Sequence, residues 1–259
     1  PGTDVYDLPD STKAFPDGAH YRMEISGVER PQVLEALIDE MEKRDIAIHR
    51  LISTVMGSTL LDDAELKDFA QMAADHDLEV IITPGPRSGW DVGRQLVTPE
   101  GGLSGLRYRG SDQLTYVIAE YLRCIDLGFR GFLCIDEGLL WLVNELQKTG
   151  DIPEDVVFKV SIYAGHANAA GGKVLERLGA STFNPVGDLT LPQLASIRQA
   201  IDIPLDLHIM LSESFGGFNR FYEGAEMARV CSPCYFKIEP GPALAAGAGA
   251  WYKPWTSPD

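Results

Sequence analysis

Two ionisable residues interrupt an apolar run in the last quarter of the chain. The segment IPLDLHIM (203–210) has the composition of a buried strand, yet Asp206 and His208 lie two residues apart, on one face of it. Burying a carboxylate and an imidazole costs free energy unless each has a partner. We therefore expect these two side chains to bind a metal, to transfer a proton, or to pair with each other.

Other apolar runs carry polar residues in the same way, and these residues form two chemical groups. Oxygen and imidazole donors suit a divalent metal such as Mg²⁺, Mn²⁺ or Zn²⁺. The metal ligands that we predict are Glu24, Asp136, Asp206, His208 and Glu239. Cationic and amide side chains suit a carboxylate, a phosphate or a developing enolate. The substrate-binding residues that we predict are Arg50, Arg87, Asn184, Lys237 and Arg220.

A predicted catalytic set overlaps with both groups. Carboxylates beside lysines serve as acid–base pairs for proton transfer next to a carbonyl. Lys159 would stabilise an enolate, or would form a Schiff base if burial or neighbouring cations lowered its pKa. No G-x-S-x-G motif of a serine nucleophile occurs. The catalytic residues that we predict are Lys159, Asp206, His208, Glu24 and Asp136.

Two loops favour an anionic ligand. The segment SFGGFNR (214–220) places a glycine pair and Arg220 where many barrels bind phosphate or carboxylate. The long segment 88–112 contributes Arg94, Arg107 and Arg109. Loops of this length are usually lids or substrate-binding elements.

These residues follow short apolar runs that alternate with amphipathic segments. The alternation indicates a parallel sheet covered on both faces, and eight units in about 240 residues are what a closed (β/α)₈ TIM barrel requires. An open doubly wound sheet is the alternative, but no Gly-rich dinucleotide motif supports it. We expect the polar residues to lie at the carboxyl ends of the strands, around one mouth of the barrel. The predicted strands lie at 21–26, 46–52, 78–85, 131–138, 156–163, 181–187, 203–210 and 234–241.

The predicted organisation is a single domain with two extensions. Residues 1–19 form an N-terminal arm that covers the barrel floor, and residues 20–241 form the barrel. Residues 242–259 form a tail that is rich in Gly and Ala and then aromatic. The composition of this tail indicates a lid, or an element that docks on a neighbouring subunit of a homo-oligomer.

Composition and charge exclude some partners. The 259 residues are 45% hydrophobic and carry a net charge of −16, which argues against nucleic acid and anionic membranes as partners. No signal peptide opens the chain and no apolar run approaches the roughly 20 residues of a membrane span, so we expect a cytoplasmic protein. Cys231 and Cys234 have ligand-like spacing but no second pair accompanies them. We therefore expect structural thiols rather than a zinc or iron–sulfur site.

Several segments resemble one family of bacterial barrel proteins. They are DEGLL (136–140), FKVS (158–161), NPVGDLTLPQLASIRQAIDIPLD (184–206), GGFNR (216–220) and YFKIEPG (235–241). The family is grouped with the collagenase-like peptidases of unassigned catalytic type, family thirty-two of that class. The resemblance implies a (β/α)₈ barrel. Better-understood members of the superfamily look like iron–sulfur proteins with four cysteine ligands, and here only Cys231 and Cys234 are present for such a role.

We therefore expect an enzyme that acts on a small anionic substrate by metal-assisted or lysine-assisted acid–base chemistry, of the lyase, isomerase or epimerase type. A peptidase-like hydrolase, which the family resemblance suggests, is one alternative. A non-catalytic barrel that binds a ligand is the other.

Overall fold

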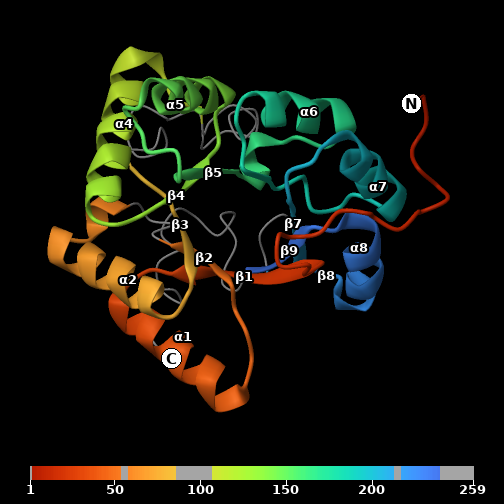
Figure 1. The fold of residues 1–259 in the computed structure, drawn as a ribbon, viewed down its shortest axis with the longest axis horizontal. Coiled ribbons are helices and arrows are strands. Elements are labelled where there is room, and N and C mark those ends of the chain that lie inside the picture. The colour runs from red at the N-terminus through yellow and green to blue at the C-terminus, as the bar shows by residue number, and fades with distance from the viewer. Residues whose placement is uncertain (1, 54–57, 86–106, 213–216, 240–259) are drawn as a thin grey trace.

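A closed barrel of parallel strands forms the centre of the molecule (Figure 1). The computed structural model describes residues 2–53, 58–85, 107–212 and 217–239. Within them the strands follow the order β6-β5-β4-β3-β2-β1-β9-β7, and pairing of β6 with β7 closes the ring. The predicted (β/α)₈ barrel is therefore confirmed. The barrel strands are β1 (Tyr21–Val28), β2 (Arg50–Ser53), β3 (Glu79–Ile82), β4 (Gly131–Cys134), β5 (Val157–Val160), β6 (Thr182–Phe183), β7 (Leu205–Leu211) and β9 (Cys234–Glu239).

Helices surround the barrel on its outer side (Figure 1). A further short strand, β8 (Phe218–Asn219), pairs antiparallel with the end of β7 and lies outside the ring. No helix in the described ranges is long and apolar enough to cross a membrane. The α-helices of these ranges are α1 (Pro31–Arg44), α2 (Asp63–Asp75), α4 (Gly110–Asp126), α5 (Glu137–Thr149), α6 (Ala169–Arg177), α7 (Leu191–Ala200) and α8 (Gly224–Cys231).

Side chains at the helix starts explain where several helices begin. Asp62 accepts a hydrogen bond from the Glu65 amide while the Glu65 side chain accepts one from the Asp62 amide, which makes a capping box for α2. Asp136 and Asn168 accept amide hydrogen bonds at the starts of α5 and α6. Such caps satisfy amides that have no partner within the helix.

Apolar side chains fill the space between the strands and the helices. Tyr121 on α4 stacks on Phe132 of β4, with ring centroids 4.5 Å apart, and lies 5.9 Å from Phe158 of β5. Adjacent residues of a strand point to opposite faces, so the residues between these outward positions point into the barrel. On β7, Leu205 and Leu207 alternate with Asp206 and His208. The polar residues of the strands therefore face the barrel interior.

The segment before β1 contacts the amino-terminal end of the barrel. Phe15 is buried and its ring meets Tyr235 edge-on, with centroids 5.2 Å apart. The Arg22 guanidinium lies 4.3 Å from the centre of the Phe15 ring. Lys13 Nζ donates to the Ile201 carbonyl over 2.5 Å, beside α7. The predicted tail, residues 242–259, lies outside the described residues.

Candidate functional site

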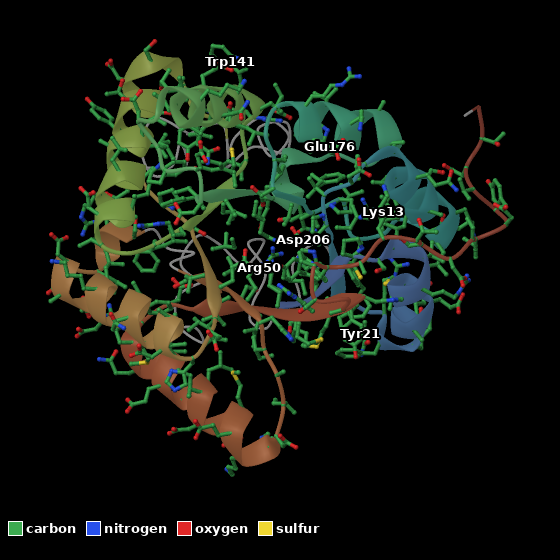
Figure 2. All side chains as sticks on the ribbon, viewed as in Figure 1. Lys13, Tyr21, Arg50, Trp141, Glu176 and Asp206 are labelled. Atoms are coloured by element: carbon green, nitrogen blue, oxygen red, sulfur yellow. The ribbon has the colours of Figure 1, made fainter. Side chains whose placement is uncertain are left out.

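A cluster of charged side chains lies inside the barrel, and Figure 2 shows Arg50 and Asp206 at its centre. We call Glu24, Arg50, Lys159, Thr182 and Asp206 the lower layer. Arg50 donates hydrogen bonds to both Glu24 and Asp206. Lys159 Nζ lies 3.1 Å from Glu24 Oε2 and 2.6 Å from Asp206 Oδ2. Thr182 Oγ1 donates to Asp206 Oδ2 over 2.8 Å, so both carboxylates have partners.

The Arg50 guanidinium also packs against the aromatic ring of Tyr235. Its Cζ lies 3.3 Å from the centre of the Tyr235 ring, a cation–π contact. Tyr235 Oη donates to Glu79 Oε2 over 2.9 Å, and Glu79 Oε1 lies 3.9 Å from Arg50 Nη1. Sequence reasoning missed Tyr235, Glu79 and Thr182. Tyr235 lies two residues before Lys237, on the same face of β9. This spacing could have identified Tyr235 from the sequence as a residue that faces the barrel interior.

Strand register explains why these residues meet. Arg50 is the first residue of β2 and pairs with Glu24 on one side and Glu79 on the other. Asp206 is the second residue of β7 and pairs with Tyr235. The expectation that Arg50 and Asp206 lie at the carboxyl-end mouth is therefore wrong. Strand β2 begins at residue 50 instead of 46, which places Arg50 at the amino end.

Burial and neighbouring charges set the protonation of the lower layer. Burial alone would raise the pKa of Glu24 and Asp206, but Arg50 and then Lys159 hold both pKa values below their usual range. Burial alone would lower the pKa of Arg50, yet Asp206 and Glu24 raise it. Burial and the nearby Arg50 lower the pKa of Lys159 to about 8. Lys159 is therefore the member of this layer whose pKa lies nearest to neutral.

A second group of buried polar residues lies in the middle of β7, in the middle and at the end of β9, and directly after β6. We call Asn184, His208, Lys237 and Glu239 the upper layer. Asn184 Nδ2 lies 3.2 Å from His208 Nδ1, and His208 Nε2 lies 3.3 Å from Glu239 Oε2. Lys237 Nζ lies 3.4 Å from the same Glu239 oxygen. Glu239 ends β9 and Asn184 follows β6, so this row extends toward the end of the barrel at which enzymes of this fold hold their active sites.

The neighbours of His208 indicate a neutral imidazole with its proton on Nε2. The Asn184 amide nitrogen also donates to the Asp206 carbonyl over 2.8 Å, so it faces His208 Nδ1 as a donor. A proton on Nδ1 would place two donors against each other. Nε2 then donates to Glu239. Burial, and after it Lys237, lower the pKa of His208, which agrees with a neutral ring.

Lys237 has donor capacity left over. Its Nζ lies within 4 Å of two carboxylate oxygens, Glu239 Oε2 at 3.4 Å and Glu24 Oε1 at 3.9 Å. Lys237 donates a side-chain hydrogen bond to Glu239, and Glu24 Oε1 is buried without a hydrogen-bond partner. An ammonium group carries three donors. The site therefore presents a nearly buried cation that is able to bind an anionic group.

Asp136 belongs to a different group of residues, at the ends of β4 and β5. Its Oδ1 accepts from the Leu139 amide over 3.1 Å, as the cap of α5. Next to it, Glu137 accepts hydrogen bonds from Arg107, and His166 Nε2 lies 2.6 Å from Glu137 Oε1. The structure gives Asp136 a structural role here, and its catalytic and metal-binding roles stay predictions.

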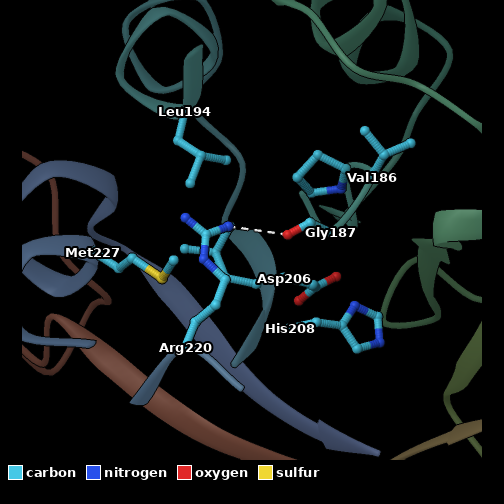
Figure 3. Close-up of a pocket in the computed structure, with 9 residues that line it drawn as sticks. Val186, Gly187, Leu194, Asp206, His208, Arg220 and Met227 are labelled. Atoms are coloured by element: carbon cyan, nitrogen blue, oxygen red, sulfur yellow. Dashed lines mark hydrogen bonds between the residues drawn. The ribbon is translucent and has the colours of Figure 1, made fainter. Parts of the chain in front are cut away.

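Arg220 lines a pocket between β7 and the helices α7 and α8 (Figure 3). The pocket has an empty volume of about 200 Å³, which includes its opening to solvent. Arg220 donates to the carbonyls of Gly187 and Leu189 over 3.0 and 2.9 Å, and its Nε donates to Glu223 over 2.6 Å. Figure 3 shows its guanidinium directed toward Gly187 and away from His208. Arg87 lies outside the described residues.

The predicted metal ligands do not form a free donor set. The carboxylates of Glu24 and Asp206 are engaged by Arg50 and Lys159. Over the described ranges, no group of three or more His, Cys, Asp or Glu side chains is arranged to hold a metal ion. Cys231 and Cys234 are buried, and burial raises the pKa of Cys231 to about 12. The divalent metal stays a prediction, and we derive no step through it.

Comparisons with known proteins extend the fold assignment. No family model and no curated protein sequence matches this chain. The solved structure of the U32 peptidase Mk0906 has a TM-score of 0.52 and 16% identity, and covers 92% of this chain and 98% of that chain. D-psicose 3-epimerase from Clostridium cellulolyticum H10 has a TM-score of 0.52 and 11% identity, over 89% and 90% of the two chains. The YdjI aldolase from Escherichia coli K12 has a TM-score of 0.50 and 15% identity, and the match covers 85% of this chain and 75% of that chain. The chain therefore shares the (β/α)₈ barrel fold with a peptidase, an epimerase and an aldolase.

Proposed function

We propose that this barrel is an enzyme that transfers a proton next to a carbonyl or carboxylate group of a small anionic substrate, as isomerases, epimerases and lyases do. One observation carries the proposal. The upper layer is a directly linked row of a lysine, a carboxylate, a histidine and an amide that extends from the middle of β7 and β9 toward the end of the barrel where enzymes of this fold act. A barrel that needed only stability would gain little from burying these groups.

Lys237 is the residue that we assign to the anionic group of the substrate. It is 6% exposed, and one of its three N–H donors is directed at Glu239. A substrate carboxylate or phosphate, or an oxygen that becomes negative during the reaction, would complete its hydrogen bonding. In a site shielded from water such a charge stabilises the transition state more than it would in solution.

His208 and Glu239 are the residues that we assign to positioning Lys237. Glu239 holds the imidazole in the tautomer with a proton on Nε2. The single N–H of the neutral imidazole is used by Glu239, so His208 orients the carboxylate that lies 3.4 Å from Lys237 Nζ. Asn184 fixes the other face of the ring.

Lys159 is the residue that we assign to lysine-assisted chemistry. An amine with a pKa of about 8 has a reactive free-base fraction near neutral pH, as a base or as a nucleophile. Its position below Lys237, across Glu24, places both amines at one carboxylate.

Solvent exchange tests the proposed function without knowledge of the full reaction. The chain is incubated in D₂O with a panel of small keto acids, hydroxy acids and sugar phosphates, and loss of the hydrogen next to the carbonyl or carboxylate group is followed by NMR. We expect exchange with at least one compound, slowed about a hundredfold by Lys237→Met. Lys148→Met, which removes an exposed lysine on α5, is the matched control.

Two results would redirect the proposal. Equal exchange by the chain and by Lys237→Met would remove Lys237 from the site. Binding of a panel compound, seen as line broadening, without exchange would indicate a binding barrel. A peptide mixture treated in parallel tests the hydrolase alternative.

A further inference from the structure

We propose that Arg220 is a positioning residue of the upper layer, which holds Asn184 against His208 and thereby fixes the orientation of the imidazole. The inference rests on the proposed function and adds to its site a residue that lies behind β7. It is an alternative to the substrate-binding role that the sequence predicts for Arg220. Three features of the structure support it.

The first feature is a gap between β6 and β7. Within the described ranges the two strands share one residue pair, Phe183 with Leu205. Beyond this pair, the pocket of about 200 Å³, a volume that includes its opening to solvent, lies between β7 and the segment that follows β6 (Figure 3). The Asn184 side chain crosses from that segment to β7, with Nδ2 2.8 Å from the Asp206 carbonyl and 3.2 Å from His208 Nδ1. Strand pairing in these ranges therefore does not set the distance between Asn184 and His208.

The second feature is a bulge in β7 directly after His208. The residues of β7 that pair with β9 step from His208 to Met210, so Ile209 is left without a partner residue on β9. Bulges change the direction of the side chains next to them. The Ile209 carbonyl accepts a hydrogen bond from the backbone N–H of Arg220 over 2.7 Å. The backbone of Arg220 is therefore fixed to β7 at the residue after His208.

The third feature is the contact of the Arg220 side chain with the opposite side of the gap. Its Nη1 donates to the carbonyls of Gly187 and Leu189 over 3.0 and 2.9 Å, while its Nε donates to Glu223 over 2.6 Å. The side chain is 12% exposed, so these hydrogen bonds are largely shielded from water. The Phe218 ring packs on the same segment, because a carbon added at Gly187 would lie 2.6 Å from Phe218 Cζ.

Arg220 therefore holds both sides of the gap. Its amide binds β7 beside His208, and its guanidinium binds the segment that follows Asn184. Packed side chains do not fill the pocket, so the segment has room to move when the guanidinium is removed. The segment stays attached on its other side, where the amides of Asn184 and Val186 donate to carbonyls of β5 and of the loop after it. Loss of Arg220 is thus expected to weaken the hydrogen bond between Asn184 and His208 without unfolding the barrel.

Nitrogen NMR of the imidazole tests this role at the residue that Arg220 positions. The chain is labelled with ¹⁵N-histidine, and His208→Gln identifies the His208 signals among those of the five histidines. A neutral imidazole has one acceptor nitrogen, whose signal depends on whether it accepts a hydrogen bond. In Arg220→Met we expect the Nδ1 signal of His208 to shift toward the position of a nitrogen without a hydrogen bond. Asn184→Ala removes the donor itself and sets the full size of this shift.

Three further variants sharpen the measurement. Arg229→Met is the matched control, because Arg229 also donates to a distant carbonyl and also pairs with a glutamate three residues away, but it holds the N-terminal arm. We expect it to leave the His208 signals in place. Arg220→Lys keeps a donor for the carbonyls and is expected to shift the Nδ1 signal less than Arg220→Met does. Gly187→Ala pushes the segment away from Phe218 and is expected to shift the same signal with Arg220 intact, which keeps the test valid if Arg220→Met does not fold.

A double variant separates action through Asn184 from a general loosening of the barrel. If Arg220 acts through Asn184, Arg220→Met combined with Asn184→Ala shifts the Nδ1 signal no further than Asn184→Ala alone. Additive shifts overturn the positioning role. So does an unchanged Nδ1 signal in Arg220→Met, or an equal shift in Arg229→Met.

The result is independent of the solvent-exchange experiment, because the signals are measured without substrate. If the Nδ1 signal shifts as expected while no compound of the panel exchanges, Arg220 positions His208 and the proposed function fails. If exchange depends on Lys237 while the Nδ1 signal does not respond to Arg220→Met, the proposed function stands and the positioning role of Arg220 fails.

Discussion

We expect the protonation of Glu239 to account for a large part of the stability that the upper layer loses in acid. Burial alone would raise its pKa, but Lys237 and His208 lower it to about 2. Because the folded pKa lies below the ordinary value, this group contributes stability that is fully present above about pH 4.5. The contribution is lost as the pH falls through 2, where the folded carboxylate takes up its proton.

Glu239→Gln tests this coupling between pH and stability. Urea unfolding at pH 5 and at pH 2.5 is expected to show a smaller stability difference for the variant than for the original chain. The change is at most about 3 kcal/mol, since one pKa unit corresponds to about 1.4 kcal/mol. Glu154→Gln, at an exposed glutamate, is the control. An unchanged difference in Glu239→Gln would mean that Glu239 does not pair with Lys237 and His208.

Residue types in the site were largely predictable from the sequence, whereas their heights in the barrel were not. Alternation along IPLDLHIM places Asp206 and His208 on one face, and both do face the interior. The alternation of residues along a strand specifies the face on which a side chain lies. It does not specify the residue of the neighbouring strand with which that side chain pairs. Asp206 therefore pairs with Arg50 in the lower layer, and only His208 joins the upper layer.

Among the secondary-structure elements, strand positions followed the apolar runs and strand ends did not. The run IAIHRLI predicts a strand over 46–52, but β2 spans Arg50–Ser53. The residue pairs that β2 forms with Glu24 of β1 and Glu79 of β3 begin at Arg50. Helix starts were easier to predict, because a capping side chain is a local signal. Asp62 is an example.

Substitutions at Asp136 distinguish a helix-capping role of this residue from a catalytic role. Asp136→Ala is expected to lower the free energy of unfolding by about 1 kcal/mol, because the Leu139 amide loses its acceptor. Asp136→Asn keeps an acceptor oxygen and is expected to retain most of that stability. Thermal or urea unfolding measures both. Loss of solvent-exchange activity in a stably folded Asp136→Asn would restore the predicted catalytic role.

For the whole molecule, Arg50 on β2 connects five other strands of the barrel. It contacts Glu24 on β1, Asp206 on β7 and Tyr235 on β9. It also reaches Thr182 on β6 at 3.5 Å and Glu79 on β3 at 3.9 Å. Sequence reasoning assigned Arg50 to substrate binding, because a long-range network of this kind leaves no local pattern. Its side chain is fully buried and paired with Glu24 and Asp206, and its substrate-binding role stays a prediction.

Arg50→Met tests this role. The substitution keeps much of the apolar volume but leaves Glu24 and Asp206 with Lys159 as their remaining cation in the lower layer. We expect a loss of about 3 to 5 kcal/mol in the free energy of unfolding, as for other buried pairs that lose one partner. Arg44→Met, which removes an exposed ion pair of α1, is expected to change little. A small loss in Arg50→Met would show that the barrel does not depend on the network.

The equal numbers of positive and negative groups in the lower layer make its four charged positions interdependent over evolution. A change at Glu24, Lys159 or Asp206 alone leaves an uncompensated charge away from water. The same change is tolerated when a second position loses the opposite charge, and apolar residues at all four positions are tolerated best. We therefore expect variation at these positions to occur in sets, and we expect the sign of each substitution's effect to depend on the residues already present at the others.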